Sequence, residues 1–137
     1  MSAETVRDAM VPEPTTLAAD ASAQEAGRCF ADNGEVRAIF VTEEGGQLLG
    51  VVTRKTLVQE IVATGRDPGA TTLRDIAEPP LFTLDASMNL DDAYRALEDH
   101  DLERVPVVED GRLVGILSRT VLQRRLAEDE PPAQQQV

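Results

Sequence analysis

The sequence of 137 residues is poor in the side chains that most catalytic and metal centres use. It has one cysteine, Cys29, one histidine, His100, and no tryptophan. A single cysteine excludes an internal disulfide, and so few thiol and imidazole groups argue against a zinc site. We expect Cys29 to be a packed core thiol and His100 to lie on the surface near a helix end. The many carboxylates fall in predicted turns and on predicted helix faces, so we expect no enzyme.

Long hydrophobic stretches are also absent. No apolar run approaches the roughly 20 residues that span a bilayer, and the first residues lack the basic and apolar parts of a secretory signal. These absences predict a cytoplasmic protein. The net charge of −12 repels nucleic acids and anionic lipids, so we expect neither nucleic acid nor membrane as a partner. Apolar residues still make up 42% of the chain, enough for a core of Ala, Val, Leu and Ile.

The sequence contains two copies of one pattern. An offset of 67 residues (5 to 72) aligns Thr5-Val6-Arg7-Asp8 with Thr72-Leu73-Arg74-Asp75. An offset of 65 (50 to 115) aligns Gly50-Val51-Val52-Thr53-Arg54 with Gly115-Ile116-Leu117-Ser118-Arg119. Self-similarity over such a distance indicates two copies of one supersecondary unit, and neither copy is expected to bury its apolar face alone.

Each repeat predicts a short helical turn, a strand, a helix, two strands and a final helix. We assign residues 5–64 to the first repeat, 65–70 to a linker, 71–127 to the second repeat and 128–137 to a disordered tail. In the first repeat we expect a turn over 5–10, a strand at 15–17, a helix after the capping box of Ser22 and Glu25, a hairpin of 38–41 and 48–52, and a last helix with the apolar stripe Leu57, Val58, Ile61 and Val62. In the second we expect a turn from Thr72, a helix capped by Asn89 and Asp92, a hairpin of 105–108 and 113–117, and a helix over 119–127.

This duplicated β-α-β-β-α unit resembles the tandem CBS domain pair, also called the Bateman module. The signature G-h-h-[ST]-x-x occurs as Gly50-Val51-Val52-Thr53-Arg54-Lys55 and as Gly115-Ile116-Leu117-Ser118-Arg119-Thr120. The strand 105–108 and the lead-in Thr-Val-Arg-Asp-Ala-Met are also similar to the family, and the resemblance covers about residues 5–127. It implies an α+β, sandwich-like fold of two CBS repeats packed with pseudo-twofold symmetry. It further implies a freestanding regulatory module rather than an enzyme, commonly a homodimer.

The resemblance also implies ligand clefts between the repeats, where many members bind AMP, ADP, ATP or S-adenosylmethionine, with no cofactor required. In the family, the hydroxyl after the third strand reaches ribose or phosphate, and an arginine at the start of the second strand meets phosphate. The implied ligand-binding residues are Thr15, Val36, Arg37, Thr53, Arg54, Thr56, Phe82, Arg104, Ser118 and Arg119. One cleft would combine Arg37, Thr53 and Thr56 with Ala77, Phe82 and the neighbourhood of Glu103, and the other would combine Arg104, Ser118 and Val121 with Met10, Thr15 and Val36.

The sequence departs from the family pattern at the ribose. Many nucleotide-binding members carry an aspartate three residues after the Ser or Thr, where this chain has Thr56 and Val121. Hydrogen bonds to a charged partner contribute roughly 1.5–3 kcal/mol each, so their loss weakens adenosine recognition. Two interpretations stay open. The leading one is a sensor for an adenine nucleotide or related phosphorylated ligand. The alternative is a ligand-free dimerisation module that acts through an unidentified protein effector, with the arginines as ordinary surface charges and Phe82 as a plug.

Overall fold

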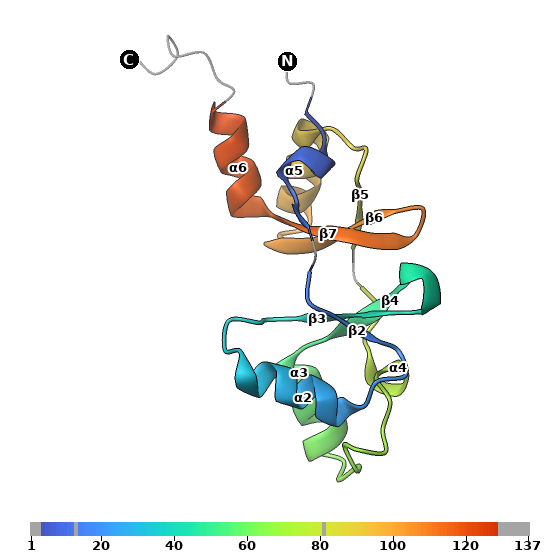
Figure 1. Cartoon of the computed structure of the whole chain (residues 1–137). Helices are drawn as coiled ribbons and strands as arrows, with labels where there is room; N and C mark the ends of the chain where they lie inside the picture. The colour runs from blue at the N-terminus through green and yellow to red at the C-terminus, as the bar shows by residue number, and fades with distance from the viewer. Residues whose placement is uncertain (1–3, 13, 81, 129–137) are drawn as a thin grey trace. The chain divides into compact units, whose positions relative to one another are not determined.

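The computed structural model describes residues 4–12, 14–80 and 82–128, which form two compact units (Figure 1). Unit 1 contains 4–12, 82–110 and 114–128. Unit 2 contains 14–80 and 111–113. Unit 1 therefore combines the start of the first repeat with most of the second, and unit 2 combines the body of the first repeat with the start of the second.

Unit 2 is built on a three-stranded sheet in the order β2-β3-β4. β2 (Thr16–Ala18) runs parallel to β3 (Ile39–Thr42), and β3 runs antiparallel to β4 (Leu48–Val52), which comes after the short turn η1 (Glu44–Gly46). The helices are α2 (Ala23–Asp32), α3 (Arg54–Leu57), its π-helical continuation η2 (Val58–Val62) and α4 (Leu73–Ile76). α2 begins where Ser22 accepts a hydrogen bond from the Glu25 N–H at 3.1 Å, as the sequence predicts.

Unit 1 is built on a four-stranded sheet in the order β1-β7-β6-β5. Its strands are β1 (Val11–Pro12), β5 (Leu84–Asp85), β6 (Arg104–Glu109) and β7 (Arg112–Ser118), and its helices are α1 (Val6–Ala9), α5 (Leu90–Asp99) and α6 (Arg119–Glu128). The Asn89 side chain caps α5 by accepting from the Asp92 N–H at 2.8 Å. Asp110 and Gly111 have positive φ angles of 53° and 81°, the geometry of a tight hairpin turn between β6 and β7.

Each unit has its own apolar core. In unit 2 the core joins α2, η2 and α4 to the sheet: Ala19, Ala23, Ala26, Phe30, Ile39, Val41, Val52, Ile61, Leu73 and Ile76. In unit 1 it joins α1, α5 and α6 to the sheet: Val6, Ala9, Leu84, Ala86, Leu90, Ala93, Leu97, Val105, Val107, Leu117 and Leu122. The mixed helix and sheet class and the two tandem repeats predicted from the sequence are confirmed.

The start of each repeat pairs with the third strand of the other repeat. In unit 1, β1 pairs antiparallel with β7, placing Val11 opposite Ile116 and Pro12 opposite Gly115. In unit 2, Glu78 pairs with Val51 through two backbone hydrogen bonds of 2.8 and 2.9 Å. The offset of 67 aligns Val11 with Glu78, so the same edge pairing occurs twice.

This pairing explains the glycine of both signature copies. A Cβ atom at Gly50 would lie 2.6 Å from the Glu78 carbonyl oxygen and 3.1 Å from the Ala77 Cβ. A Cβ atom at Gly115 would lie 2.9 Å from the Val11 carbonyl oxygen and 2.6 Å from the Met10 sulfur. The close approach of a second backbone leaves no room for a side chain at either position.

Two predictions about the final helix of the first repeat are wrong. The apolar pattern places Val58 and Val62 in its buried stripe, but their exposed fractions are 56% and 72%. Ile61 is buried, Leu57 is half-buried and Thr56 is fully buried, so these three residues face inward.

The smaller expectations have mixed outcomes. Cys29 is half-buried and packs against the core of unit 2, and His100 is exposed at the end of α5. Across 4–12, 14–80 and 82–128, no helix is long and apolar enough to cross a membrane. The predicted tail lies outside the described residues, apart from Glu128 at the end of α6.

Candidate functional site

The predicted ligand residues divide between the two units. Unit 2 holds Thr15, Val36, Arg37, Thr53, Arg54 and Thr56, and unit 1 holds Phe82, Arg104, Ser118 and Arg119. The predicted grouping of these residues into two clefts stays a prediction.

Thr53 ends β4 and caps α3. Its hydroxyl accepts from the Thr56 N–H at 3.3 Å, and its own N–H donates to the Thr56 hydroxyl at 3.1 Å. The two hydroxyl oxygens also lie 3.1 Å apart. This reciprocal capping box holds the backbone at the end of the signature in a fixed conformation. Thr53 remains half-buried, and Thr56 is fully buried.

The burial of Thr56 changes the interpretation of that residue. The sequence suggests a neutral hydrogen bond from Thr56 to a ribose, but the hydroxyl is turned inward to the helix cap. The structure gives Thr56 a folding role. Its contact with a ribose stays a prediction, and that contact would require the hydroxyl to leave the cap.

Ser118 occupies the equivalent place in unit 1. Its hydroxyl oxygen accepts from the Val121 N–H at 3.2 Å at the start of α6. A serine hydroxyl that accepts in this way keeps its own proton as a donor. Val121, the position aligned with Thr56, has no polar group and is half-buried. The two signature copies therefore share the helix cap and differ at the third residue after it.

Arg54 binds the loop between α2 and β3. Its guanidinium donates to the carbonyl oxygen of Val36 at 2.7 Å and to that of Phe30 at 3.2 Å, with longer contacts to those of Asn33 and Gly34. It also lies over the Phe30 ring, 4.8 Å from the centroid. A cation at the carbonyl end of a helix is favourable. Arg54 thus stabilises the loop that leads to Arg37, and its predicted contact with an anion stays a prediction.

Arg119 has the corresponding position in unit 1. Its guanidinium lies 3.5 Å from an Asp101 carboxylate oxygen and 3.6 Å from a Glu103 carboxylate oxygen. The backbone N–H of Arg119 donates to the backbone carbonyl of Glu103 at 2.7 Å. Glu103 also accepts from the Thr120 hydroxyl at 2.7 Å, and this hydrogen bond lowers the pKa of the Glu103 carboxyl, with the nearby charges of Arg119 and Arg104 adding to it. The sequence places Glu103 near one predicted cleft, where an unpaired carboxylate would repel a phosphate. In the structure this carboxylate is paired with Arg119.

Arg37 and Arg104 differ from these two arginines. Arg37 lies two residues before β3, Arg104 begins β6, and both side chains are exposed. Within the described part of the chain, neither guanidinium forms a hydrogen bond or an ion pair. They are the candidate anion ligands whose donors are not already used by the protein.

The other predicted residues have backbone or packing roles. The carbonyl of Thr15 accepts from the Phe40 N–H at 2.9 Å where β2 begins, and the Val36 carbonyl accepts from Arg54. Phe82 packs against the core of unit 1 and lies against the His100 ring, with 4.6 Å between ring centroids and 34° between the ring planes. Phe82 is half-buried. Its two predicted roles, stacking on a ligand base and plugging the ligand cleft, both stay predictions.

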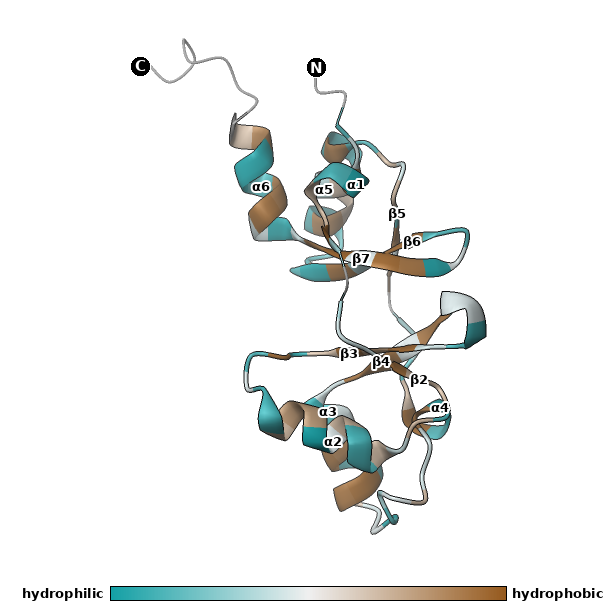
Figure 2. Cartoon of the chain, in the orientation of Figure 1, coloured by the Kyte–Doolittle hydropathy of each residue, from teal (hydrophilic) through white to brown (hydrophobic). Residues whose placement is uncertain are grey.

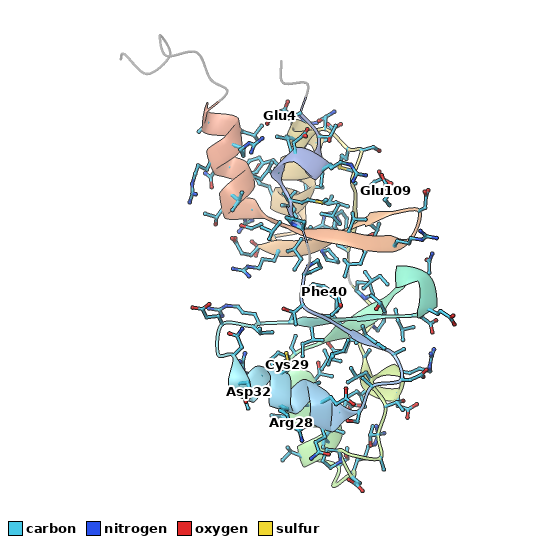
Figure 3. The ribbon with its side chains drawn as sticks, in the orientation of Figure 1. Glu4, Arg28, Cys29, Asp32, Phe40 and Glu109 are labelled. Atoms are coloured by element: carbon cyan, nitrogen blue, oxygen red, sulfur yellow. The ribbon has the colours of Figure 1, made fainter. Side chains whose placement is uncertain are left out.

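Two arginines were missed by sequence reasoning. Arg7 of α1 forms an ion pair with Glu109, labelled in Figure 3, at the end of β6. Arg74 of α4 pairs with Glu43 at 2.6 Å, and this hydrogen bond raises the pKa of Arg74. Both belong to the Thr-x-Arg-Asp motif at the start of each repeat. The repetition of this motif is the sequence signal that could have identified the two arginines. Each arginine attaches its lead-in to the body of the other repeat.

Among the residues with described positions, no group of three or more His, Cys, Asp or Glu side chains is arranged to hold a metal ion. A small hollow beside β2 contains carboxylates, but two of them already pair with an arginine. It is lined by Ala18, Ala19, Asp20, Thr42, Glu43, Glu44 and Arg74, and Arg74 already pairs with Asp20 as well as Glu43.

Curated relatives match this chain in sequence. CBS domain-containing protein YhcV of Bacillus subtilis is 31% identical over 113 residues, which cover 82% of this chain and 79% of that protein. Hypoxic response protein 1 of Mycobacterium tuberculosis is 29% identical over 94 residues, and the uncharacterized protein MK0525 of Methanopyrus kandleri is 26% identical over 113. The matched region spans 66% and 55% of the lengths of these last two proteins.

Solved structures have the same fold. The crystal structure of Hypoxic Response Protein I with two coordinated zinc ions has a TM-score of 0.75 and 26% identity, covering 91% of this chain and 99% of that one. The crystal structure of CBSX2 in complex with AMP has a TM-score of 0.70 and 28% identity, covering 91% and 97%. The family model of the CBS domain matches this chain twice, over residues 6–63 and 73–128. With two matches that together cover most of its length, the chain belongs to the CBS domain family.

Proposed function

We propose that this chain is a regulatory module that binds an adenine nucleotide, such as AMP, ADP or ATP, or a related adenosyl or phosphorylated ligand. The observation that carries the proposal is the pair Arg37 and Arg104, which occupy equivalent places in the two repeats. Both are exposed, and across the described residues neither forms an ion pair. The AMP complex of CBSX2, which has the same fold, supports the ligand class.

The charge of the protein makes these arginines informative. In a chain with a net charge of −12, some arginines pair with carboxylates, as Arg7, Arg74 and Arg119 do. A phosphate held by the planar guanidinium gains charge-assisted hydrogen bonds. Arg37 and Arg104 have the free donors that such a contact requires.

Recognition of the ribose is the weaker part of the site. No carboxylate stands at Thr56 or Val121, and Thr56 is buried. The hydroxyl of Ser118 accepts from a helix N–H and keeps a proton to donate. We therefore propose that affinity depends mainly on the phosphate groups, so that adenosine binds much more weakly than AMP.

The proposal includes the cellular setting. We propose a cytoplasmic, non-enzymatic protein that acts as a homodimer and transmits the ligand signal to an unidentified protein effector. A ligand shifts such a module only through its different affinities for two conformations. Neither nucleic acid nor membrane belongs to the proposed partners, because the acidic surface repels phosphate polymers and anionic lipids.

A thermal-shift panel tests the ligand class. The panel contains AMP, ADP, ATP and S-adenosylmethionine, with adenosine and inorganic phosphate as the two partial ligands. A ligand at 100 times its dissociation constant adds about 2.7 kcal/mol to the free energy of unfolding. We expect stabilisation by at least one nucleotide that Arg37→Ala or Arg104→Ala reduces and that Arg66→Ala, an exposed arginine of the linker, leaves unchanged.

The outcomes separate the two interpretations. Stabilisation that survives both arginine substitutions would refute the assignment of these residues. If no compound of the panel stabilised the protein, the sensor would be contradicted. The ligand-free protein-interaction module would then be favoured.

A further inference from the structure

The two signature arginines hold the loop before the second strand of their own repeat, but with different partners. In unit 2, Arg54 donates to the backbone carbonyl oxygen of Val36 at 2.7 Å. In unit 1, the aligned Arg119 lies 3.5 Å from a carboxylate oxygen of Asp101 and 3.6 Å from one of Glu103. A backbone carbonyl is a neutral acceptor, whereas an ionised carboxylate carries a charge. One arginine position therefore fixes the two loops through two kinds of acceptor.

This difference changes how much of each arginine's charge is compensated. Across the described residues, the partners of Arg54 are backbone carbonyls and the Phe30 ring, so no carboxylate offsets its charge. Arg119 has carboxylates of two residues within 3.6 Å, and charges at such a distance interact appreciably even near the surface. The loop of unit 2 thus retains a positive charge that the loop of unit 1 largely cancels.

The neighbouring positions show the same asymmetry. The offsets of 67 and 65 align residues 34–37 with 101–104 and residues 53–56 with 118–121. In the first repeat these positions contain three cations and one carboxylate: Arg37, Arg54, Lys55 and Glu35. In the second repeat they contain two cations and two carboxylates: Arg104, Arg119, Asp101 and Glu103. The first repeat therefore has an excess of positive charge around its exposed strand-start arginine, and the second repeat has none.

Glu103 is fixed in place one residue before Arg104. Its carboxylate accepts from the Thr120 hydroxyl at 2.7 Å, and its backbone carbonyl accepts from the Arg119 N–H at 2.7 Å. Figure 2 shows the start of α6, which supplies both donors, in the teal of hydrophilic residues. The Thr120 hydrogen bond, with the charges of Arg119 and Arg104, lowers the pKa of the Glu103 carboxyl. An ionised carboxylate therefore stands beside Arg104 at neutral pH.

The first repeat lacks such a carboxylate. Val36 occupies the position aligned with Glu103, and it offers only its backbone carbonyl to Arg54. Glu35 is the one acid of the aligned loop; it is exposed, and within the described chain its side chain forms no ion pair. No acid is thus held in position beside Arg37.

A fixed carboxylate beside an arginine changes which phosphate that arginine prefers. The carboxylate repels an anion over the same range in which the guanidinium attracts it. The repulsion grows with the charge of the ligand, and ATP carries more negative charge than AMP. The second repeat is therefore biased toward the less charged ligand, and the first repeat has no such bias.

We propose that the two repeats select phosphate groups of different charge, with Glu103 as the specificity-determining residue. Arg37 binds the di- or triphosphate of a nucleotide, because the charges around it are predominantly positive. Arg104 binds a singly phosphorylated ligand such as AMP, because Glu103 offsets part of the attraction for a larger anion. This inference rests on the proposed function and adds the ligand class that each repeat takes.

Separate substitution of the two arginines tests the selection. AMP and ATP are titrated calorimetrically into the full chain and into Arg37→Ala and Arg104→Ala, without divalent cations. We expect Arg37→Ala to raise the ATP dissociation constant about tenfold or more, through the loss of charge-assisted hydrogen bonds, and Arg104→Ala to change it much less. For AMP the order of the two variants should be reversed.

Glu103→Gln tests the specificity-determining residue. Glutamine keeps an acceptor for the Thr120 hydroxyl and removes the charge, so we expect the ATP dissociation constant to fall roughly threefold or more. Asp91→Asn is the matched control, because it makes the same change in net charge at an exposed position of the first turn of α5. It should leave ATP affinity unchanged. The gain from Glu103→Gln should disappear in an Arg104→Ala background, because the two residues act on one phosphate.

The outcomes separate this inference from the sensor itself. Equal losses of ATP affinity in Arg37→Ala and Arg104→Ala would overturn the selection and leave the sensor in place. So would an ATP affinity that Glu103→Gln and Asp91→Asn change alike, because net charge would then explain it. If the wild type bound neither AMP nor ATP, the sensor would be rejected and this inference with it. Circular dichroism without ligand checks that each variant is folded.

Discussion

Replacing Gly50 by alanine perturbs the contact between β4 and the lead-in of the second repeat. The new Cβ would lie 2.6 Å from the Glu78 carbonyl oxygen, and that oxygen belongs to backbone rather than to a flexible side chain. Relief of the clash moves Glu78 away from Val51, with which it forms backbone hydrogen bonds of 2.8 and 2.9 Å.

The size of the effect combines three contributions. Overpacking a well-packed site costs about 1–3 kcal/mol, and each weakened hydrogen bond costs up to about 1 kcal/mol. Alanine offsets about 0.4–1 kcal/mol by restricting the unfolded chain. We expect Gly50→Ala to lower the free energy of unfolding by about 2 kcal/mol, which corresponds to roughly 4–8 °C in melting temperature for a chain of intermediate size.

Gly34→Ala is the matched control. A Cβ atom at Gly34 has no neighbour within 4 Å, and its φ angle is not positive. We expect this variant to equal the wild type or to exceed it slightly in urea unfolding monitored by circular dichroism. If Gly50→Ala unfolds at the same urea concentration as Gly34→Ala, the close approach of the two backbones is refuted as the reason for the signature glycine.

Three further predictions concern the caps, the arginine clamp and acid stability. Thr53→Ala and Ser118→Ala should each lower the free energy of unfolding by about 1 kcal/mol, measured in urea, because each removes a helix cap; no change would contradict the capping role. Arg54→Ala should destabilise more than Arg54→Lys in the same assay, since lysine keeps the charge but not the fork that reaches several carbonyls; equal values would contradict a specific clamp. Hydrogen bonds from Ser87 lower the pKa of Asp85, so their stabilisation is present above the ordinary Asp pKa of 3.8 and is lost as the pH falls through the lower folded-state value. Ser87→Ala should therefore reduce stability at neutral pH and converge with the wild type in acid, and parallel pH profiles would contradict this.

Local signals in the sequence predicted most of the fold. The caps at Ser22 and Asn89 and the turn at Gly111 depend on residues a few positions apart, so short motifs reveal them. The exposure of Val58 and Val62 could not be predicted in this way. Apolar periodicity identifies a stripe, but the width of the stripe that a core accepts depends on the helix packed against it.

The candidate site was harder to predict because its donors compete for partners within the protein. Arg54 and Thr56 have the right residue types next to the signature, but Arg54 binds carbonyls of a preceding loop and Thr56 is buried in a cap. Arg7 lies 102 residues from its partner Glu109, a separation that no local pattern reveals. Sequence position alone did not separate these arginines from Arg37, whose guanidinium has no partner in the described chain.

Isothermal titration calorimetry of AMP into the wild type and into an Arg37→Ala/Arg104→Ala double variant tests the regulatory sensor most directly. We predict saturable binding to the wild type and a dissociation constant raised at least tenfold, which is about 1.4 kcal/mol, in the double variant, with an unchanged melting temperature in the absence of ligand. Equal affinities of the wild type and the double variant would contradict the central claim. It would also be contradicted if AMP gave the wild type neither binding heat nor a thermal shift.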